Sequence, residues 1–238
     1  MGMWEPWRGC RRISEGCRNC YIHKGDKKRG TDTRVIVKTE RFYAPIEKNR
    51  NGEYKMRSGQ IVYVCFSSDF LIEDADVWRA ECWEMMKTRS DLFFIFLTKR
   101  IERFEMCVPT DWGEGYDNVL VGCTVENQRT ADIRLQFFDR AKIKHKNIIC
   151  QPLLEKIDLS DHLRGVERVI VGGESDANAR PLNFDWVLSI RKQCIDCQVS
   201  FQFRQCGTNF VKNDRTYRLK TRDLVSQAKK ANIDYHAR

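Results

Sequence analysis

The sequence lacks any apolar run long enough to cross a bilayer, which argues against a protein built on membrane helices. Residues 1–5 also contain no apolar stretch of the kind found in secretory signal peptides. We therefore expect a cytoplasmic protein, in which the eleven cysteines stay reduced as thiols. Cysteines that cluster in such a protein point to a bound metal rather than to disulfides.

Histidine is scarce, and the usual hydrolase patterns are missing. The four histidines are scattered, with neither a His-Glu-x-x-His motif nor a Ser-His-Asp arrangement. The chain also contains no internal repeat and no low-complexity tract. Its 238 residues are 42% hydrophobic, which is enough to build a core. We therefore expect a folded protein with little support for hydrolase chemistry.

Basic residues are concentrated at the two ends of the chain, whose net charge is +9. Residues 8–50 contain 13 Lys or Arg against 5 Asp or Glu, and residues 204–238 contain 9 against 3. The middle of the chain, 51–203, is almost neutral, with 20 against 24. A local basic surface attracts polyanions, above all nucleic acid. The alternative is a solvated basic surface that has no partner.

Short apolar runs rich in Val, Ile and Phe alternate with stretches of helical spacing. We predict strands at residues 61–66, 93–97, 119–125, 147–150, 168–171 and 199–203, with a seventh, short candidate around 3–7. We predict helices at 77–86, 128–138 and 184–194, the last capped by Asn183 or Asp185. Strands that alternate with helices pair in parallel through crossover connections.

This alternation predicts an α/β fold, namely an incomplete (βα) barrel of about six parallel strands with an N-terminal cysteine loop. We expect one domain over residues 1–238. Two segments depart from the pattern. The first is a basic excursion at 24–60, with 34–42 extended and a turn at 49–52. The second is a basic C-terminal extension at 207–238.

Three cysteines lie within eleven residues near the start of the chain, at Cys10, Cys17 and Cys20. Thiolates grouped on one short loop are typical of an iron–sulfur cluster or a zinc site. On a four-iron cluster, three thiolates leave one iron open to the amino and carboxylate groups of S-adenosylmethionine. Alternatively, His23 completes a zinc site of three cysteines and one histidine.

The other cysteines point to packing rather than to a site. Cys194 fits the apolar stripe of the helix predicted at 184–194. Of the three cysteines near the C-terminal end, Cys194, Cys197 and Cys206, only Cys197 has no expected packing role. The alternative is a second metal site on Cys194, Cys197 and Cys206. The cysteines of the predicted strands, which we expect in the core, are Cys65, Cys123 and Cys150.

Polar residues follow each predicted strand, at the end where parallel α/β proteins bind their ligands. One strand runs into Gly172-Gly173-Glu174-Ser175, whose glycines allow a ligand to approach the backbone closely. Arg180, on the same loop, is suited to a carboxylate or a phosphate. The other candidates for binding cofactor and substrate are Lys99, Arg100, Glu126 and Asn127. Each of these side chains is alternatively a helix cap or a surface charge.

Ordered motifs run along nearly the whole chain. The first is Trp4-x-Pro6-Trp7-x-Gly9-Cys10-x3-Ser14-x-Gly16-Cys17-x2-Cys20-Tyr21. The others are Ser68-Asp69-x-Leu71, Leu97-Thr98-Lys99-Arg100, Val125-Glu126-Asn127-Gln128-x2-Ala131-Asp132-x-Arg134, Pro152-Leu153-Leu154 and Val171-Gly172-Gly173-Glu174-Ser175-x4-Arg180-Pro181. Together they resemble the three-cysteine proteins of phages and bacteria that are related to radical S-adenosylmethionine enzymes.

The resemblance implies a partial (βα) barrel, a four-iron cluster on Cys10, Cys17 and Cys20, and S-adenosylmethionine at the open iron. Similar proteins are encoded in mobile elements, often beside a partner protein of unknown role. The chain departs from the pattern in three places. Its loop is Cys-x6-Cys-x2-Cys, where radical enzymes usually have Cys-x3-Cys-x2-Cys. Gln151 replaces the acidic residue that commonly precedes Pro-Leu-Leu, and Cys206 replaces a common tryptophan.

We therefore expect a cytoplasmic radical S-adenosylmethionine enzyme that acts on a nucleic acid or nucleotide and receives an electron from a separate donor. Tyr21 and Cys197 are candidate hydrogen donors in such a reaction. Two alternatives stay open. One is a zinc-stabilised nucleic-acid-binding protein without catalysis, and the other is a cluster-bearing subunit that needs a partner protein.

Overall fold

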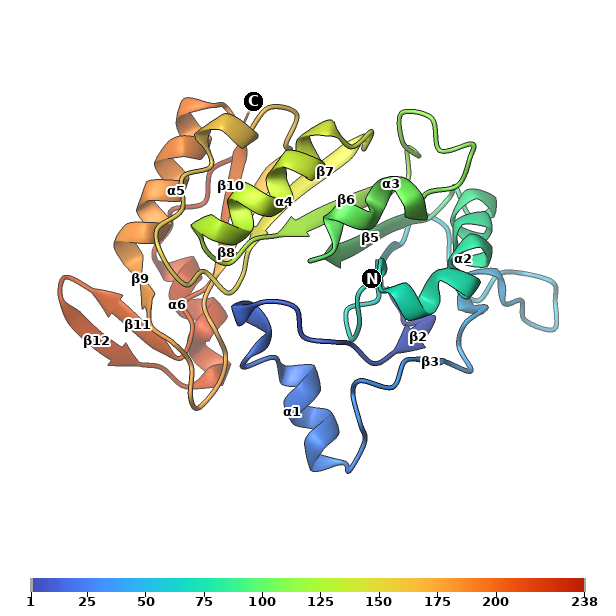
Figure 1. The fold of residues 1–238 in the computed structure, drawn as a ribbon, viewed down its shortest axis with the longest axis horizontal. Helices are drawn as coiled ribbons and strands as arrows, with labels where there is room; N and C mark the ends of the chain where they lie inside the picture. Colours follow the sequence, from blue (N-terminus) through green and yellow to red (C-terminus); the bar gives the residue numbers. More distant parts are fainter. Residues whose placement is uncertain (1, 238) are drawn as a thin grey trace. The chain divides into compact units, whose positions relative to one another are not determined.

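The computed structural model describes residues 2–237 as an α/β protein whose main sheet has seven parallel strands (Figure 1). Their order is β1-β4-β5-β6-β7-β8-β10, so neighbours in the sheet follow one another along the chain. In the described residues, β1 and β10 form the two edges and the barrel is not closed. The strands are β1 (Gly2–Trp4), β4 (Ile61–Val64), β5 (Phe93–Thr98), β6 (Val119–Thr124), β7 (His145–Cys150), β8 (Arg168–Gly172) and β10 (Ser200–Gln205).

The α/β class and the open parallel sheet are confirmed, and all six predicted strands are present. The expected number of about six was one too low. The seventh strand, β1, overlaps the short candidate predicted around 3–7 but begins one residue earlier and has only three residues. It pairs in parallel with β4, with Gly2 opposite Val62 and Trp4 opposite Val64. The three predicted helices are also present, as α2 (Asp76–Thr88), α4 (Gln128–Arg140) and α5 (Phe184–Asp196).

The described residues divide into two compact units. The first comprises residues 2–11, 22–122 and 140–145. Aromatic side chains form its core: Phe70 stacks on Trp7 with ring centroids 5.3 Å apart and lies 4.7 Å from Phe96. The helix α2 contributes Trp83, which donates from its indole nitrogen to the carbonyl oxygen of Cys107 at 2.7 Å. This buried partner explains why a polar indole is tolerated in the core.

The second unit comprises residues 12–21, 123–139 and 146–237. Here α4 and α5 bury apolar faces that include Leu135, Phe138, Val187 and Ile190. The start of α5 is capped as predicted, because the side chain of Asn183 accepts from the backbone N–H of Asp185 at 2.9 Å. A second, three-stranded sheet in this unit has the order β12-β11-β9, formed by β9 (Leu182–Asn183), β11 (Asn209–Lys212) and β12 (Arg215–Arg218).

The two irregular segments are more ordered than expected. Most of 24–60 lies in α1 (Tyr21–Lys28), in turns, and in the short strand β3 (Val37–Lys38), which pairs with β2 (Trp7–Arg8). The prediction that 34–42 is extended was therefore wrong outside β3, whereas the turn at 49–52 is confirmed by a bridge between Lys48 and Tyr54. The C-terminal extension contains β11, β12 and α6 (Leu224–Lys230), and the short α3 spans Phe104–Cys107.

Among the helices of residues 2–237, none combines the length and the apolar character needed to span a membrane.

Candidate functional site

Two buried carboxylates follow strands of the main sheet at their carboxyl ends. Glu126 comes two residues after β6 and is 0% exposed, and Glu174 comes two residues after β8 and is 7% exposed. Both belong to the second unit, which also contains residues 12–21 of the cysteine loop. A charged side chain this deeply buried needs partners, and the loop supplies several of them.

Glu126 holds the first half of this loop segment. One carboxylate oxygen accepts from the hydroxyl of Ser14 at 2.6 Å, and the other accepts from Arg134 at 2.8 Å. The carbonyl oxygen of Ser14 in turn accepts from the backbone N–H of Cys17 at 3.0 Å. Arg134, only 5% exposed, also donates to the carbonyl oxygen of Thr124 at 2.7 Å. The turn that carries Cys17 is thus connected to a buried ion pair between Glu126 and Arg134 of α4.

Glu174 holds the second half of the segment. It accepts from the side-chain amide of Asn19 at 2.9 Å and from the backbone N–H of Arg180 at 2.7 Å. The guanidinium of Arg180 pairs with the same carboxylate and donates to the carbonyl oxygen of Glu15 at 2.9 Å. Desolvation opposes the charge on Glu174, but the hydrogen bonds from Arg180 and Asn19 outweigh it and lower the pKa of this carboxyl. Glu174 is therefore an anion at neutral pH.

We expect Glu174→Gln to lower the free energy of unfolding by about 2 kcal/mol at pH 7, because charge-assisted hydrogen bonds are lost. A carboxyl whose pKa lies below its ordinary 4.5 stabilises the fold above that pH, and this contribution disappears as the pH falls through the folded value. The stability difference between wild type and variant should therefore shrink below about pH 4.5.

Urea unfolding at a series of pH values measures this difference. Glu102→Gln, which removes an exposed carboxylate from the first unit, is the matched control and should change stability little at any pH. A Glu174→Gln deficit that stayed constant from neutral to acid pH would contradict the assigned charge state.

Cys10 lies in the first unit and is held by different partners. Its backbone N–H donates to the carbonyl oxygen of Thr33 at 2.7 Å, and the preceding Gly9 carbonyl accepts from the Ser68 hydroxyl at 2.5 Å. Burial opposes the charge of Arg100, but Asp69 and then Cys10 interact with it and raise its pKa. The same attraction acts on a Cys10 thiolate, the form of cysteine that binds metals.

Asp69 organises the end of β5 in this unit. It is 4% exposed and accepts from the Thr98 hydroxyl at 2.7 Å, the Lys99 backbone at 3.0 Å and the Arg100 guanidinium at 3.2 Å. Arg100 also donates to the carbonyl oxygen of Arg11 at 3.0 Å. Arg100 thus secures the backbone next to Cys10.

The other predicted ligand-binding residues have structural tasks in this conformation. Asn127 directly precedes α4, and its side chain accepts from the backbone N–H of Thr130 at 2.9 Å. Gly173 packs closely on another glycine, since a Cβ atom there would lie 2.7 Å from the Cα atom of Gly207. A Cβ atom at Gly172 would lie 2.9 Å from the Cδ atom of Gln151, and Ser175 is exposed. These glycines allow close packing between segments of the second unit.

Several residues that matter here were not singled out as site candidates. Ser14, Asn19 and Arg134 connect the loop to the strand ends, and Asp69 arranges the residues after β5. Ser14, Asp69 and Arg134 do lie within the ordered motifs. Their roles become evident only when the carboxylate that each one contacts is known.

The thiol set fits a soft metal or a cluster in its chemistry. All eleven cysteines lie in the described residues and none forms a disulfide. Cys17 is 8% exposed, and Cys10 and Cys20 are half-buried. Residues 2–237 contain no preassembled group of three or more His, Cys, Asp or Glu side chains placed to hold a metal ion. The three thiols of the loop are nevertheless donors of the type that soft metals and iron–sulfur clusters prefer, and the loop that carries them has an anchored backbone.

The remaining cysteines are mostly core residues, as expected. Burial raises the pKa of Cys194 to about 12 and that of Cys206 to about 11, which keeps both as unreactive thiols. Cys65, Cys123 and Cys150 are at most 2% exposed. Cys197 alone among the eleven is exposed.

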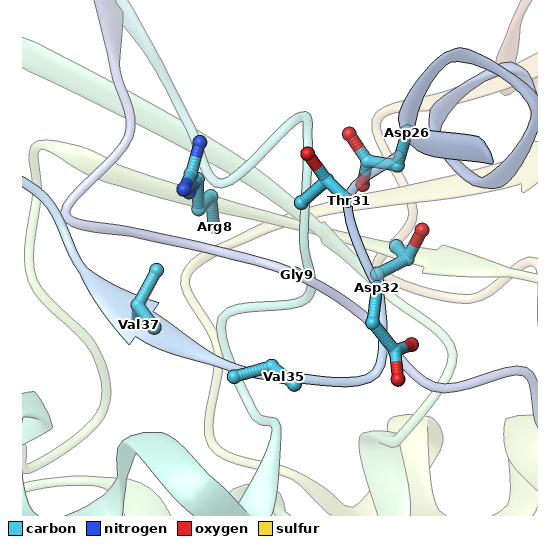
Figure 2. A pocket seen from close by; sticks show the side chains of 8 residues that line it. Arg8, Gly9, Asp26, Thr31, Asp32, Val35 and Val37 are labelled. Atoms are coloured by element: carbon cyan, nitrogen blue, oxygen red, sulfur yellow. The ribbon is translucent and has the colours of Figure 1, made fainter. Parts of the chain in front are cut away.

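A small pocket lies beside Gly9 in the first unit (Figure 2). Arg8, Asp26, Asp32 and Val35 are among the residues that line it. Asp26 accepts from Arg29 at 2.6 Å, and Asp32 pairs with Arg34 at 2.9 Å, so both carboxylates already have cationic partners. We assign no ligand to this pocket.

The fold and the two carboxylate anchors define an α/β protein with a cysteine loop fastened after its parallel strands. The chain belongs to the family described as "Protein of unknown function (DUF5131)", whose model matches residues 2–234. No curated protein and no solved structure matches the chain.

Proposed function

We propose that the protein is a radical S-adenosylmethionine enzyme that acts on a nucleic acid or nucleotide. The observation that carries the proposal is the fastening of the loop that bears Cys17 and Cys20. Buried Glu126 and Glu174, both placed after parallel strands, bind Ser14 and Asn19 of that loop. Parallel α/β folds bind their ligands at this end of the strands, so a cluster held there meets the substrate site.

In this proposal Cys10, Cys17 and Cys20 hold a [4Fe-4S] cluster. When bound, the cluster and S-adenosylmethionine supply reductive cleavage to a carbon radical. The residues of the chain have positioning tasks. Glu126 and Arg134 fix the turn before Cys17, and Glu174 with Arg180 fixes the backbone on both sides of it. Arg100 favours the thiolate at Cys10.

The substrate class rests on the charge of the chain. Basic residues are concentrated in 8–50 and 204–238, while the middle of the chain is almost neutral. Such a distribution fits a polyanionic substrate. The proposed reaction also requires a separate electron donor. A partner protein is implied by the resemblance to the three-cysteine proteins of phages and bacteria.

Zinc is the second candidate, because His23 follows Cys20 by three residues and the four side chains form a common zinc donor set. In that case the protein is a nucleic-acid-binding protein without catalysis. The two functions predict different metals on the same cysteines.

We expect His23→Ala to leave the iron and sulfide content of anaerobically purified protein unchanged, because His23 is not a cluster ligand in the proposed enzyme. Quantification of iron, acid-labile sulfide and zinc in wild type and variant decides between the candidates. Loss of stoichiometric zinc together with the fold in His23→Ala would overturn the radical enzyme in favour of zinc.

A further inference from the structure

We infer that the β11–β12 hairpin is a binding surface for single-stranded nucleic acid. This inference rests on the proposed function in one respect, namely that the substrate is a nucleic acid. The strands are antiparallel, with Asn209 opposite Arg218 and Lys212 opposite Arg215. They are joined by Asn213 and Asp214, whose φ values of 50° and 58° are typical of a tight hairpin turn. Figure 1 shows β12 as the outer strand of its sheet, beside β11.

The hairpin carries positive charge that its own unit does not neutralise. Residues 212–223 contain five cations against the two carboxylates of Asp214 and Asp223. Every residue from 212 to 218 is exposed. Arg222 lies 4.0 Å from Asp223. In the part of the chain that the structure describes, no carboxylate within 4.0 Å pairs with the other four cations, which are Lys212, Arg215, Arg218 and Lys220.

The base of the hairpin packs against other elements of the second unit, which holds its backbone in place. Phe210 is 9% exposed and lies 5.7 Å from the ring of Phe184 on α5 and 6.3 Å from Phe203 on β10. Lys212 lies 5.0 Å above the ring of Phe184. A surface that is already ordered loses less entropy when a ligand binds.

Tyr217 adds an aromatic ring to this basic strand. It is 45% exposed, and it lies opposite buried Phe210 in the register. Arg215 precedes it by two residues and Arg218 follows it directly. Arginine binds phosphate through paired hydrogen bonds, and an exposed tyrosine stacks on an unpaired base. Bases within a duplex are already stacked, so this combination favours a single strand.

An anionic membrane would also attract these cations, but the hairpin lacks the apolar face that inserts into lipid. In residues 207–237 the exposed large hydrophobic side chains are Tyr217 and Val225. They are separated in sequence and lie on different elements, β12 and α6. Nucleic acid therefore fits the surface better than lipid does.

Fluorescence anisotropy with labelled single strands of about 12 nucleotides tests the inference on the full-length protein, since one such module typically covers about 4–16 nucleotides. The double variant Arg215→Ala/Arg218→Ala should bind at least about tenfold more weakly and lower the salt slope by about 1.4. Tyr217→Ala should weaken binding by about fivefold or more without changing that slope.

The matched control is Arg164→Ala/Arg168→Ala, which removes the same charge from two exposed arginines before and at the start of β8, in the nearly neutral middle of the chain. It should leave affinity nearly unchanged. Equal losses in the two double variants would overturn the inference, because net charge alone would then explain binding. Binding to phosphatidylserine vesicles but not to the oligonucleotide would also overturn it. The assay needs no cluster. If the protein contains no iron but still binds the oligonucleotide through the hairpin, that result contradicts the proposed enzyme and supports the inference about the hairpin.

Discussion

If the proposed cluster is present, we expect Cys20→Ser to reduce the iron and sulfide of anaerobically purified protein to a small fraction of the wild-type content. A four-iron cluster on three thiolates has one iron without a protein ligand, and loss of Cys20 leaves two such irons. Hydroxyl oxygen is a poor substitute for a soft thiolate. Iron and acid-labile sulfide, measured per chain after reconstitution, report the result directly.

Cys197→Ser is the matched control for this experiment. Cys197 is exposed and lies at the end of α5, outside the cysteine loop. Its removal should leave iron and sulfide at wild-type levels. Full iron content in Cys20→Ser, or equal losses in both variants, would show that the loop is not the site of the cluster.

The second large effect, a loss of stability, is expected from Gly16→Ala, which adds a single methyl group. A Cβ atom at this position would lie 2.7 Å from the Cδ atom of Glu126, well inside van der Waals contact. Glu126 cannot move aside easily, because Ser14 and Arg134 hold its carboxylate and Leu154 donates to its carbonyl oxygen. The variant must shift the turn before Cys17 or break the buried ion pair.

Overpacking of this kind costs about 1–3 kcal/mol. In a chain of this size, that lowers the melting temperature by about 2–12 °C. We also expect a lower capacity to bind iron, because in the proposed enzyme this turn carries a cluster ligand. Differential scanning calorimetry of the protein before reconstitution separates the loss of stability from the loss of metal.

Gly25→Ala provides the comparison within the same chain. A Cβ atom there would approach the guanidinium of Arg29, the mobile end of an exposed side chain, at 3.3 Å. Gly25 lies inside α1, where alanine favours the helix by about 1 kcal/mol over glycine. Gly25→Ala should therefore keep or raise the melting temperature. A Gly16→Ala protein as stable as Gly25→Ala would refute the rigid contact between Gly16 and Glu126.

The main sheet was predictable because its strands are apolar runs. In β6 all six residues are buried, and such continuous burial makes a strand visible without any knowledge of its neighbours. The helix α5 was equally clear, since Val187, Ile190 and Cys194 recur on one buried face and Asn183 caps its start. In both cases the pattern that predicts the element lies within the residues of that element.

The missed elements have no such internal signal. None of the residues of α1 is buried, and after Tyr21 and Ile22 the helix contains no large apolar side chain that could mark a buried face. All four residues of β12 are exposed. Such elements depend on pairing with other strands or on turn geometry, which composition alone does not reveal.

The site was predictable only in its chemistry. Glu126 and Glu174 were candidates because they follow strands, but their partners are Ser14, 112 residues from Glu126, and Asn19, 155 residues from Glu174. Contacts over such separations leave no local pattern in a single sequence. The hydrogen bonds of these two carboxylates to the cysteine loop therefore became evident only in the structure.

Electron paramagnetic resonance of the reduced, anaerobically purified protein, with and without S-adenosylmethionine, tests the central claim most directly. The proposed enzyme gives a four-iron signal that shifts when S-adenosylmethionine is added, because an iron open to the cofactor changes its ligands. Stoichiometric zinc with no iron, under conditions that preserve clusters, would contradict the claim. A cluster signal that S-adenosylmethionine leaves unchanged would contradict it as well.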